Sequence, residues 1–181
     1  MIAESTYRNL IASYSGQDIV TNIEEKLIPL WCDAYYTDNP KAEVVQVDLD
    51  ESSSSFSYLF DIELERVLVA FGVPIYSKHK RDASRMAGHP LANAGKFHRG
   101  HLMAHSIGGG MDINLVSQLG SLNIGAFRVL ERLVRDMAKQ SLRSFYFVRP
   151  LYGDGSQMPG RFEQCVILPS KALLYSLHNN A

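Results

Sequence analysis

The sequence predicts an α+β fold, in which an antiparallel sheet is flanked by helices and preceded by a mainly helical segment. Apolar residues recur at helical spacing through residues 5–37. Residues 56–76 begin with a strict apolar alternation and predict two strands. After residue 120, a second apolar stripe at helical spacing leads into two further predicted strands, at residues 145–148 and 163–168.

The N-terminal helices are expected to end at Asp38-Asn39-Pro40, because a residue before proline disfavours the helical conformation. A break is expected near Ser15-Gly16, where the apolar spacing is interrupted. Residues 43–50 alternate and predict a strand or an extended acidic edge, followed by a short serine-rich linker. These patterns divide the chain into a mainly helical acidic N-terminal segment, residues 1–51, and a domain of residues 52–181.

The composition is that of an ordinary soluble globular protein, with 46% hydrophobic and 20% charged residues in a chain of 181. No apolar run approaches the length of a membrane span, so no membrane association is expected. The N-terminus lacks the basic region and apolar core of a secretory signal, which favours a cytoplasmic site of synthesis and leaves export by a non-classical route as an alternative. Cys32 and Cys165 have no metal-ligand spacing and are expected to be reduced thiols.

The net charge of −1 conceals a strong asymmetry along the chain. Residues 1–66 hold four cations against thirteen carboxylates, whereas residues 67–181 hold fourteen cations against six carboxylates. This asymmetry indicates a polyanionic partner for the second part of the chain. Cations are dense in an expected long loop, residues 79–97, where Arg81 and Arg85 are candidates for nucleic-acid backbone contacts and plain surface charge is the equal alternative.

The densest group of chemically useful side chains follows this loop. It comprises His98-Arg99-Gly100-His101, Asn114, Gln118, Asn123 and Glu131. A strand near residues 100–104, a triple-glycine turn, an extended piece from Asn114 and a helix carrying Asn123 and Glu131 predict a compact ββα unit. Within one continuous helix, Asn123 and Glu131 would lie two turns and roughly 80° apart, so both could serve one site that faces His101.

These are the groups that hydrolysis of a phosphodiester with one metal ion needs. Histidine, whose ordinary pKa is about 6.5, is a base near neutral pH, which favours His101 for activating water. A divalent cation polarises the phosphoryl oxygen and neutralises the departing alkoxide. Magnesium prefers oxygen ligands and keeps most of its waters, so the Asn123 carboxamide and water held by Glu131 form a suitable site. The forked guanidinium of Arg99 suits phosphate oxygens.

The spacing of these residues resembles one known family closely. The segment 98–131 reads His-Arg-Gly-His, then Asn114, Gln118, Asn123 and Glu131, and is similar to the signature of the DNA/RNA non-specific endonucleases of the ββα-metal (His-Me finger) superfamily. That signature is Asp-Arg-Gly-His followed by an Asn…Gln…Asn…Glu series. The chain departs from it at His98, which stands where the family usually has aspartate.

The resemblance implies a ββα-metal nuclease core and assigns roles to its residues. His101 would be the general base, Asn123 the direct metal ligand, Glu131 the group that orients water around the cation, and Arg99 the phosphate ligand. Asn114 would belong to the catalytic group and Gln118 to the substrate-binding group. The expected cofactor is Mg²⁺, with Mn²⁺ as a substitute, and the expected products are 5′-phosphorylated fragments of DNA and/or RNA.

Other readings of the sequence remain open at this point. His98, His101 and His105 have the ligand type of a zinc hydrolase, although residues 98 and 101 point to opposite faces of a strand. A non-catalytic module with a degenerate site would bind nucleic acid or a partner without cutting. The acidic segment could dock a protein partner such as an inhibitor, and the whole could be a secreted or antagonistic toxin nuclease.

Overall fold

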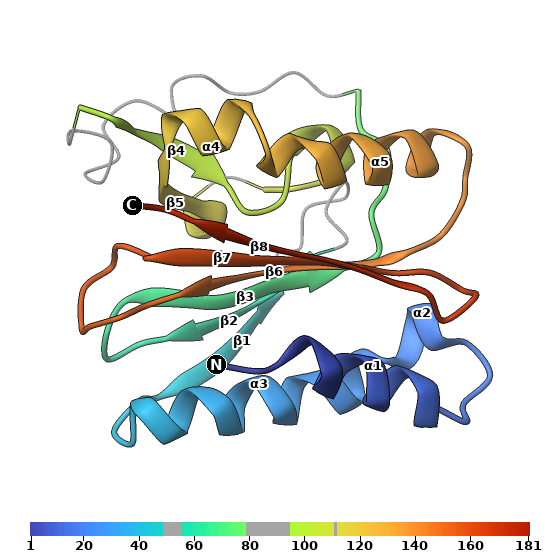
Figure 1. Cartoon of the computed structure of the whole chain (residues 1–181), viewed down its shortest axis with the longest axis horizontal. Coiled ribbons are helices and arrows are strands. Elements are labelled where there is room, and N and C mark those ends of the chain that lie inside the picture. The colour runs from blue at the N-terminus through green and yellow to red at the C-terminus, as the bar shows by residue number, and fades with distance from the viewer. Residues whose placement is uncertain (49–55, 79–94, 111) are drawn as a thin grey trace.

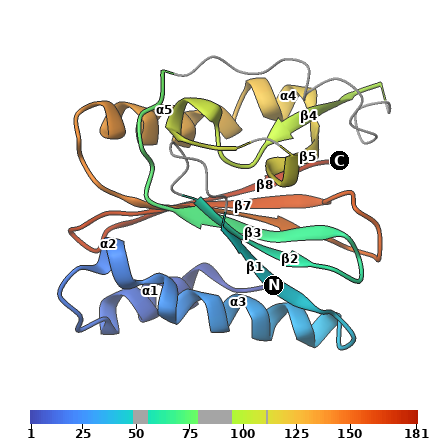
Figure 2. The same ribbon diagram turned by 180° about the vertical axis from the view of Figure 1, so that it is seen from behind.

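The computed structural model describes residues 1–48, 56–78, 95–110 and 112–181, and it is built in three layers. The middle layer is a six-stranded antiparallel sheet in the order β1-β2-β3-β6-β7-β8. Helices α1 to α3 cover one face of this sheet, and a separate β4-β5 hairpin with helices α4 and α5 covers the other (Figure 1; Figure 2 from behind). None of the described helices is long and apolar enough to cross a membrane.

The helical layer confirms the helices and the break predicted for the N-terminal part. It consists of α1 (Glu4–Ser13), α2 (Ile19–Asn22) and α3 (Glu24–Asp38). Asp18 begins α2 because its carboxylate accepts hydrogen bonds from the backbone N–H groups of Val20 and Thr21. The last helix ends at Asp38, directly before Asn39-Pro40 as expected.

The central sheet contains every strand that the alternation predicted and one more. Its strands are β1 (Val44–Asp48), β2 (Phe56–Asp61), β3 (Arg66–Gly72), β6 (Phe145–Leu151), β7 (Arg161–Ile167) and β8 (Leu173–Asn179). The additional strand is β8, which lies at the sheet edge beside β7. Its residues are mostly half-buried or exposed, so the apolar pattern that marks a strand is weak there.

The expected boundary between residues 1–51 and 52–181 falls within residues 49–55, outside the described residues. On either side of it, the helices and the sheet share one hydrophobic core, in which Tyr7, Leu27 and Trp31 pack with Phe71 and Phe147. Strand β1 also pairs with β2 across the same boundary. The helical layer is therefore an integral covering of the sheet.

The other face of the sheet carries the predicted ββα unit. Its elements are β4 (Phe97–His101), the 3₁₀ helices η3 (His105–Ile107) and η4 (Asp112–Asn114), β5 (Leu115–Leu119), α4 (Gly120–Ile124) and α5 (Phe127–Lys139). The first strand begins at Phe97, earlier than the expected residues 100–104.

The expected single helix is interrupted at Gly125, whose backbone lies at φ −108° and ψ −110°. A Cβ at that position would lie 2.6 Å from the carbonyl oxygen of Ser121, so the break depends on glycine. The break changes the buried stripe: Phe127 and Val134 face the sheet, whereas Leu133 is exposed. The prediction of one unbroken helix was therefore wrong, although both of its halves are helical.

Candidate active site

The register of the β4-β5 hairpin decides which side chains can act together. Arg99 pairs with Ser117 and His101 with Leu115, so these four residues lie on one face. His98 pairs with Gln118 on the opposite face. The two residues expected to meet the phosphate and the attacking water, Arg99 and His101, therefore share a face.

The same register removes the geometric basis of the zinc alternative. His98 and His101 lie on opposite faces of β4, so they do not converge with His105 on one ion. Within the residues that the structure describes, no three His, Cys, Asp or Glu side chains are grouped so as to hold a metal ion. His98 instead packs over the start of α4, where a Cβ added to Gly120 would lie 2.7 Å from its Nε2.

Gln118 is fully buried and lies on the face of the hairpin that carries His98. Its side chain covers the backbone of Gly100, and a Cβ at Gly100 would overlap it. The glycine between Arg99 and His101 is therefore needed for the close packing of the two strands. In this position Gln118 supports the hairpin from behind and is not exposed to a substrate.

Asn114 is also fully buried, and it holds the loop that follows β4. Its Nδ2 donates to the carbonyl oxygens of Met103 and Gly110, both at 2.7 Å, and its Oδ1 accepts from the N–H of Met103 at 2.8 Å. Two of these bonds fix the backbone of Met103, two residues after His101, and the third joins Asn114 to Gly110 across the loop. The geometry thus gives Asn114 a positioning role rather than direct contact with reacting atoms.

The face that carries Arg99 and His101 contains buried polar atoms suited to an oxygen-rich ligand. His101 is 9% exposed and its Nε2 is buried. The Nε of Arg99 and the Oγ of Ser117 are buried and have no hydrogen-bond partner among the described residues. Buried donors without partners are rare in folded proteins, and two of them opposite each other on adjacent strands fit the acceptor oxygens of a phosphate group.

Asn123 and Glu131 come from the two helices that follow the hairpin. Helix α4, which carries the half-buried Asn123, contacts both β4 and β5, and helix α5, which carries the half-buried Glu131, contacts α4 and η3. Burial, and to a smaller extent the negative charge of Glu131, raise the pKa of Tyr146 well above its usual value.

A cavity of about 290 Å³ opens between α5 and the segment after β4. It is lined by Ala104, Ser106, Arg128, Glu131, Arg132 and Arg135. Arg135 is paired with Asp136, but no carboxylate of the described residues pairs with Arg128 or Arg132. These arginines were not singled out from the sequence, although their spacing from Glu131 on one helix was the available signal.

Asn180, near the C-terminus, fixes the hairpin to the central sheet and was also missed from the sequence. Its Nδ2 donates to the carbonyl oxygens of Ser117 and Pro159 at 3.0 and 2.7 Å, and its Oδ1 accepts from the N–H of Leu119 at 2.7 Å. The sequence around Asn180 or Ser117 does not indicate this contact, because the two residues are far apart in the chain. Arg81 and Arg85, the other predicted substrate contacts, lie outside the described residues.

Several solved nuclease structures share this fold. NucA from Streptococcus agalactiae with a magnesium ion bound aligns with a TM-score of 0.60 at 16% identity, covering 83% of this chain and 88% of NucA. NucA with no metal bound aligns with a TM-score of 0.55 at 19% identity, covering 78% and 72%. The Sda1 nuclease with a bound zinc ion aligns with a TM-score of 0.50 at 15% identity, covering 77% and 75%.

Sequence comparison gives the family. No curated protein sequence matches significantly. Residues 67–166, however, match the family model for DNA/RNA non-specific endonucleases, and this range contains the hairpin, both helices of the ββα unit and strand β6. Because the match extends over more than half of the sequence and the fold agrees with nucleases of the ββα-metal type, the chain belongs to the DNA/RNA non-specific endonuclease family.

Proposed function

We propose that this nuclease is a metal-dependent endonuclease that hydrolyses phosphodiester bonds of DNA and/or RNA without sequence preference and leaves 5′-phosphorylated products. The observation that carries the proposal is the shared face of β4 on which Arg99 and His101 lie, next to the helix that bears Asn123. The cavity lined by Glu131 and three arginines lies beside the segment that follows this strand.

In this proposal His101 and Arg99 act on the phosphate and the attacking water. The neutral imidazole of His101 takes the proton from water as its oxygen approaches phosphorus. Arg99 holds the non-bridging phosphoryl oxygens, and its partnerless Nε supplies one of the donors. Ser117, directly opposite Arg99, offers a hydroxyl to the same ligand.

The carboxamide oxygen of Asn123 and the carboxylate of Glu131 would hold a divalent cation together with water. Such a cation polarises the phosphoryl oxygen and neutralises the leaving alkoxide. A small set of protein oxygen ligands fits magnesium, which retains several waters, and manganese is the expected substitute. NucA with magnesium and Sda1 with zinc support a divalent cation without deciding which one this chain uses.

The absence of sequence preference follows from the kind of side chain that lines the site. Arg128 and Arg132 have no partner among the described carboxylates and line the cavity with Glu131, where they can bind phosphates on either side of the scissile bond. Contacts to phosphate position a nucleic acid but carry no sequence information. Arg81 and Arg85 stay candidates for further contacts of this kind.

Cleavage of supercoiled plasmid, with magnesium and with chelator, tests the proposal. His101→Ala is expected to lower the cleavage rate by about 10²-fold or more, the usual contribution of a general base. The matched variants His98→Ala, on the opposite face of the same strand, and His105→Ala should lose much less. DNA affinity in chelator and the thermal midpoint should stay close to wild type.

Three outcomes would contradict the proposal. Purified protein that binds DNA but never cuts it would be a non-catalytic module. A fall in thermal midpoint that accounts for the lost activity would make His101 a structural residue. Equal losses in the His101 and His105 variants, together with tightly held zinc, would support a zinc site instead.

A further inference from the structure

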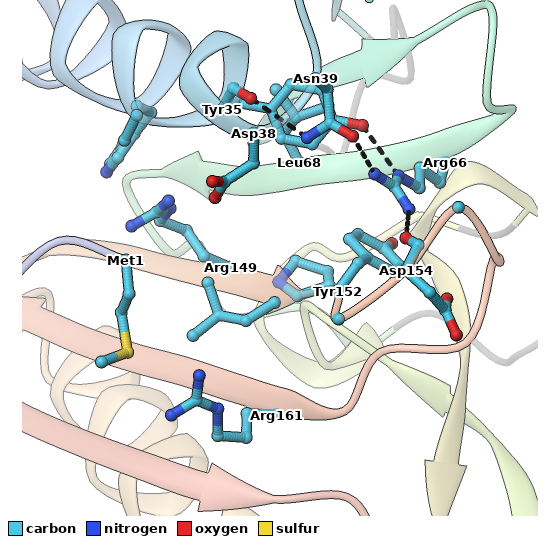
Figure 3. A pocket seen from close by; sticks show the side chains of 16 residues that line it. Met1, Tyr35, Asp38, Asn39, Arg66, Leu68, Arg149, Tyr152, Asp154 and Arg161 are labelled. Atoms are coloured by element: carbon cyan, nitrogen blue, oxygen red, sulfur yellow. Dashed lines mark hydrogen bonds between the residues drawn. The ribbon is translucent and has the colours of Figure 1, made fainter.

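A second and larger cavity lies on the other face of the central sheet, away from the hairpin. Its volume is about 490 Å³, within the range of small-molecule sites. It opens between the C-terminal half of α3 and the ends of β3, β6 and β7, and Figure 3 shows its lining. No residue of the nuclease site lines it, so it needs an explanation of its own.

One buried and fixed group in this cavity is the guanidinium of Arg149. Its side chain is only 7% exposed, and its Nη1 donates to the hydroxyl of Tyr7 and to Glu163, both at 2.8 Å. Tyr7 and Tyr175 also donate to Glu163, at 2.7 and 3.1 Å, so the carboxylate is held in turn. Within the described chain, hydrogen bonds engage only Nη1 of Arg149, and its other N–H groups remain for a ligand.

Two further donors line the same cavity without an acceptor. Arg161, half-buried at the start of β7, has no carboxylate partner among the described residues. The indole Nε1 of Trp31 is buried and has no hydrogen-bond partner in the part of the chain that the structure describes. A buried donor left without an acceptor costs about 1–3 kcal/mol, so an occupant that supplies acceptors here would stabilise the fold.

The remaining polar groups restrict what that occupant can be. Arg66 already donates hydrogen bonds to Tyr35, Asn39 and the carbonyl oxygens of Asp154 and Ser156. It therefore lines the cavity without being assigned to the ligand. Asp38 also lines the cavity, and Figure 3 shows its carboxylate directed into the same space as Arg149 and Arg161. A ligand with an anionic end and a hydroxyl or amino group at its other end matches this arrangement.

We propose that this cavity is a binding site for a small molecule that carries an oxyanion group, held by Arg149 and Arg161 and completed by the N–H of Trp31. Arginine forks match phosphate and carboxylate oxygens in geometry and charge. Nucleoside monophosphates and hydroxycarboxylates share this chemistry and fit the volume. The site is separate from the nuclease site, so the proposal does not depend on the chain's cleavage activity.

Calorimetric titration of the full chain in chelator tests the site with inorganic phosphate, adenosine monophosphate and citrate as probes. Binding at one site per chain with a raised thermal midpoint is expected for at least one probe. Comparison of the three affinities shows whether the site prefers free phosphate, a nucleoside monophosphate or a hydroxycarboxylate. Arg161→Gln should weaken binding about tenfold or more, the loss of one charge-assisted hydrogen bond. Its plasmid cleavage and its unliganded thermal midpoint should match wild type.

Two control variants make the test decisive. Arg8→Gln removes the same charge from an exposed position on α1 and should leave binding intact. Arg99→Ala removes the candidate phosphate ligand of the nuclease site and should also leave it intact. Loss of binding in Arg99→Ala with retention in Arg161→Gln would assign the anion to the nuclease site and overturn the proposal. Absence of binding for all three probes at millimolar concentration would overturn it as well, and equal weakening in Arg8→Gln would reduce it to a general charge effect.

Discussion

At the scale of the residue, His178 shows how a partly buried imidazole connects the sheet to helix α5. Its Nε2 lies 3.0 Å from the Oε1 of Gln164, whose Nε2 donates to the carbonyl oxygen of Phe127 and to the hydroxyl of Tyr146. Its ring also lies 5.6 Å from that of Phe127, the first residue of α5. Because the side chain is packed here, burial lowers the pKa of His178 below its ordinary value.

The lowered pKa makes stability depend on pH in a defined direction. The folded state holds the His178 proton less tightly than the unfolded state, whose pKa is about 6.5. The stability that depends on neutral His178 is therefore fully present above about pH 6.5, the unfolded-state pKa, and is lost as pH falls toward the folded-state pKa. In His178→Gln, urea unfolding at pH 7.5 and pH 5 should show a smaller difference in free energy than in wild type. An identical difference in the two proteins would contradict this assignment.

The residues proposed to carry the chemistry were the easiest to identify. Arg99, His101, Asn123 and Glu131 were identified by residue type and spacing, and the structure brings their strand and helices into contact. The direction in which the side chains of Asn114 and Gln118 point was harder to predict, because both residue types are equally suited to contact a substrate. The nearby glycines were the usable signal: Gly100 and Gly109 leave no room for a Cβ where these side chains and loops pack.

At the scale of the element, the segment between β4 and β5 depends on Asn114. Asn114→Asp keeps the shape of the side chain but replaces the Nδ2 donor with an oxygen that faces the carbonyl groups of Met103 and Gly110. Loss of these bonds should destabilise the fold by about 1–3 kcal/mol or more, since the site is buried. Cleavage should also fall, because the backbone after His101 is no longer held.

Two measurements together check the role of Asn114. Denaturant unfolding gives the loss in stability, and plasmid cleavage well below the unfolding midpoint gives the loss in activity. His101→Ala should lose activity alone, whereas Asn114→Asp should lose both. An Asn114→Asp protein with wild-type stability and no activity would instead place Asn114 in direct contact with the reacting groups.

The elements that the sequence missed have a common physical cause. Strand β8 is an edge strand with few buried side chains, so hydrogen bonds to β7 rather than an apolar pattern keep it in the sheet. The interruption of the helix at Gly125 depends on one backbone conformation that spacing does not reveal. Core strands and amphipathic helices show their burial as an apolar pattern in the sequence, whereas an edge strand depends on its neighbour strand and a break on one local backbone conformation.

At the scale of the whole molecule, the N-terminal helices are a required layer. Residues 1–38 cover Leu59, Val69, Phe71 and Phe147 on one face of the sheet. Deleting these 38 residues should therefore expose a large apolar surface and give an insoluble or unfolded protein, as judged by soluble yield and near-UV circular dichroism. A soluble deletion variant that cleaves plasmid at the wild-type rate would contradict this and make the helices a dispensable appendage.

The order of the layers also has an electrostatic consequence. Residues 1–38 hold six carboxylates against two cations, while α5, on the far side of the sheet, carries four cations against two carboxylates. A chain that is nearly neutral in total is thus a molecular dipole whose axis crosses the sheet. A long polyanion in solution would turn this dipole as it drew near, so that collisions begin with the hairpin side foremost and the acidic helices trailing.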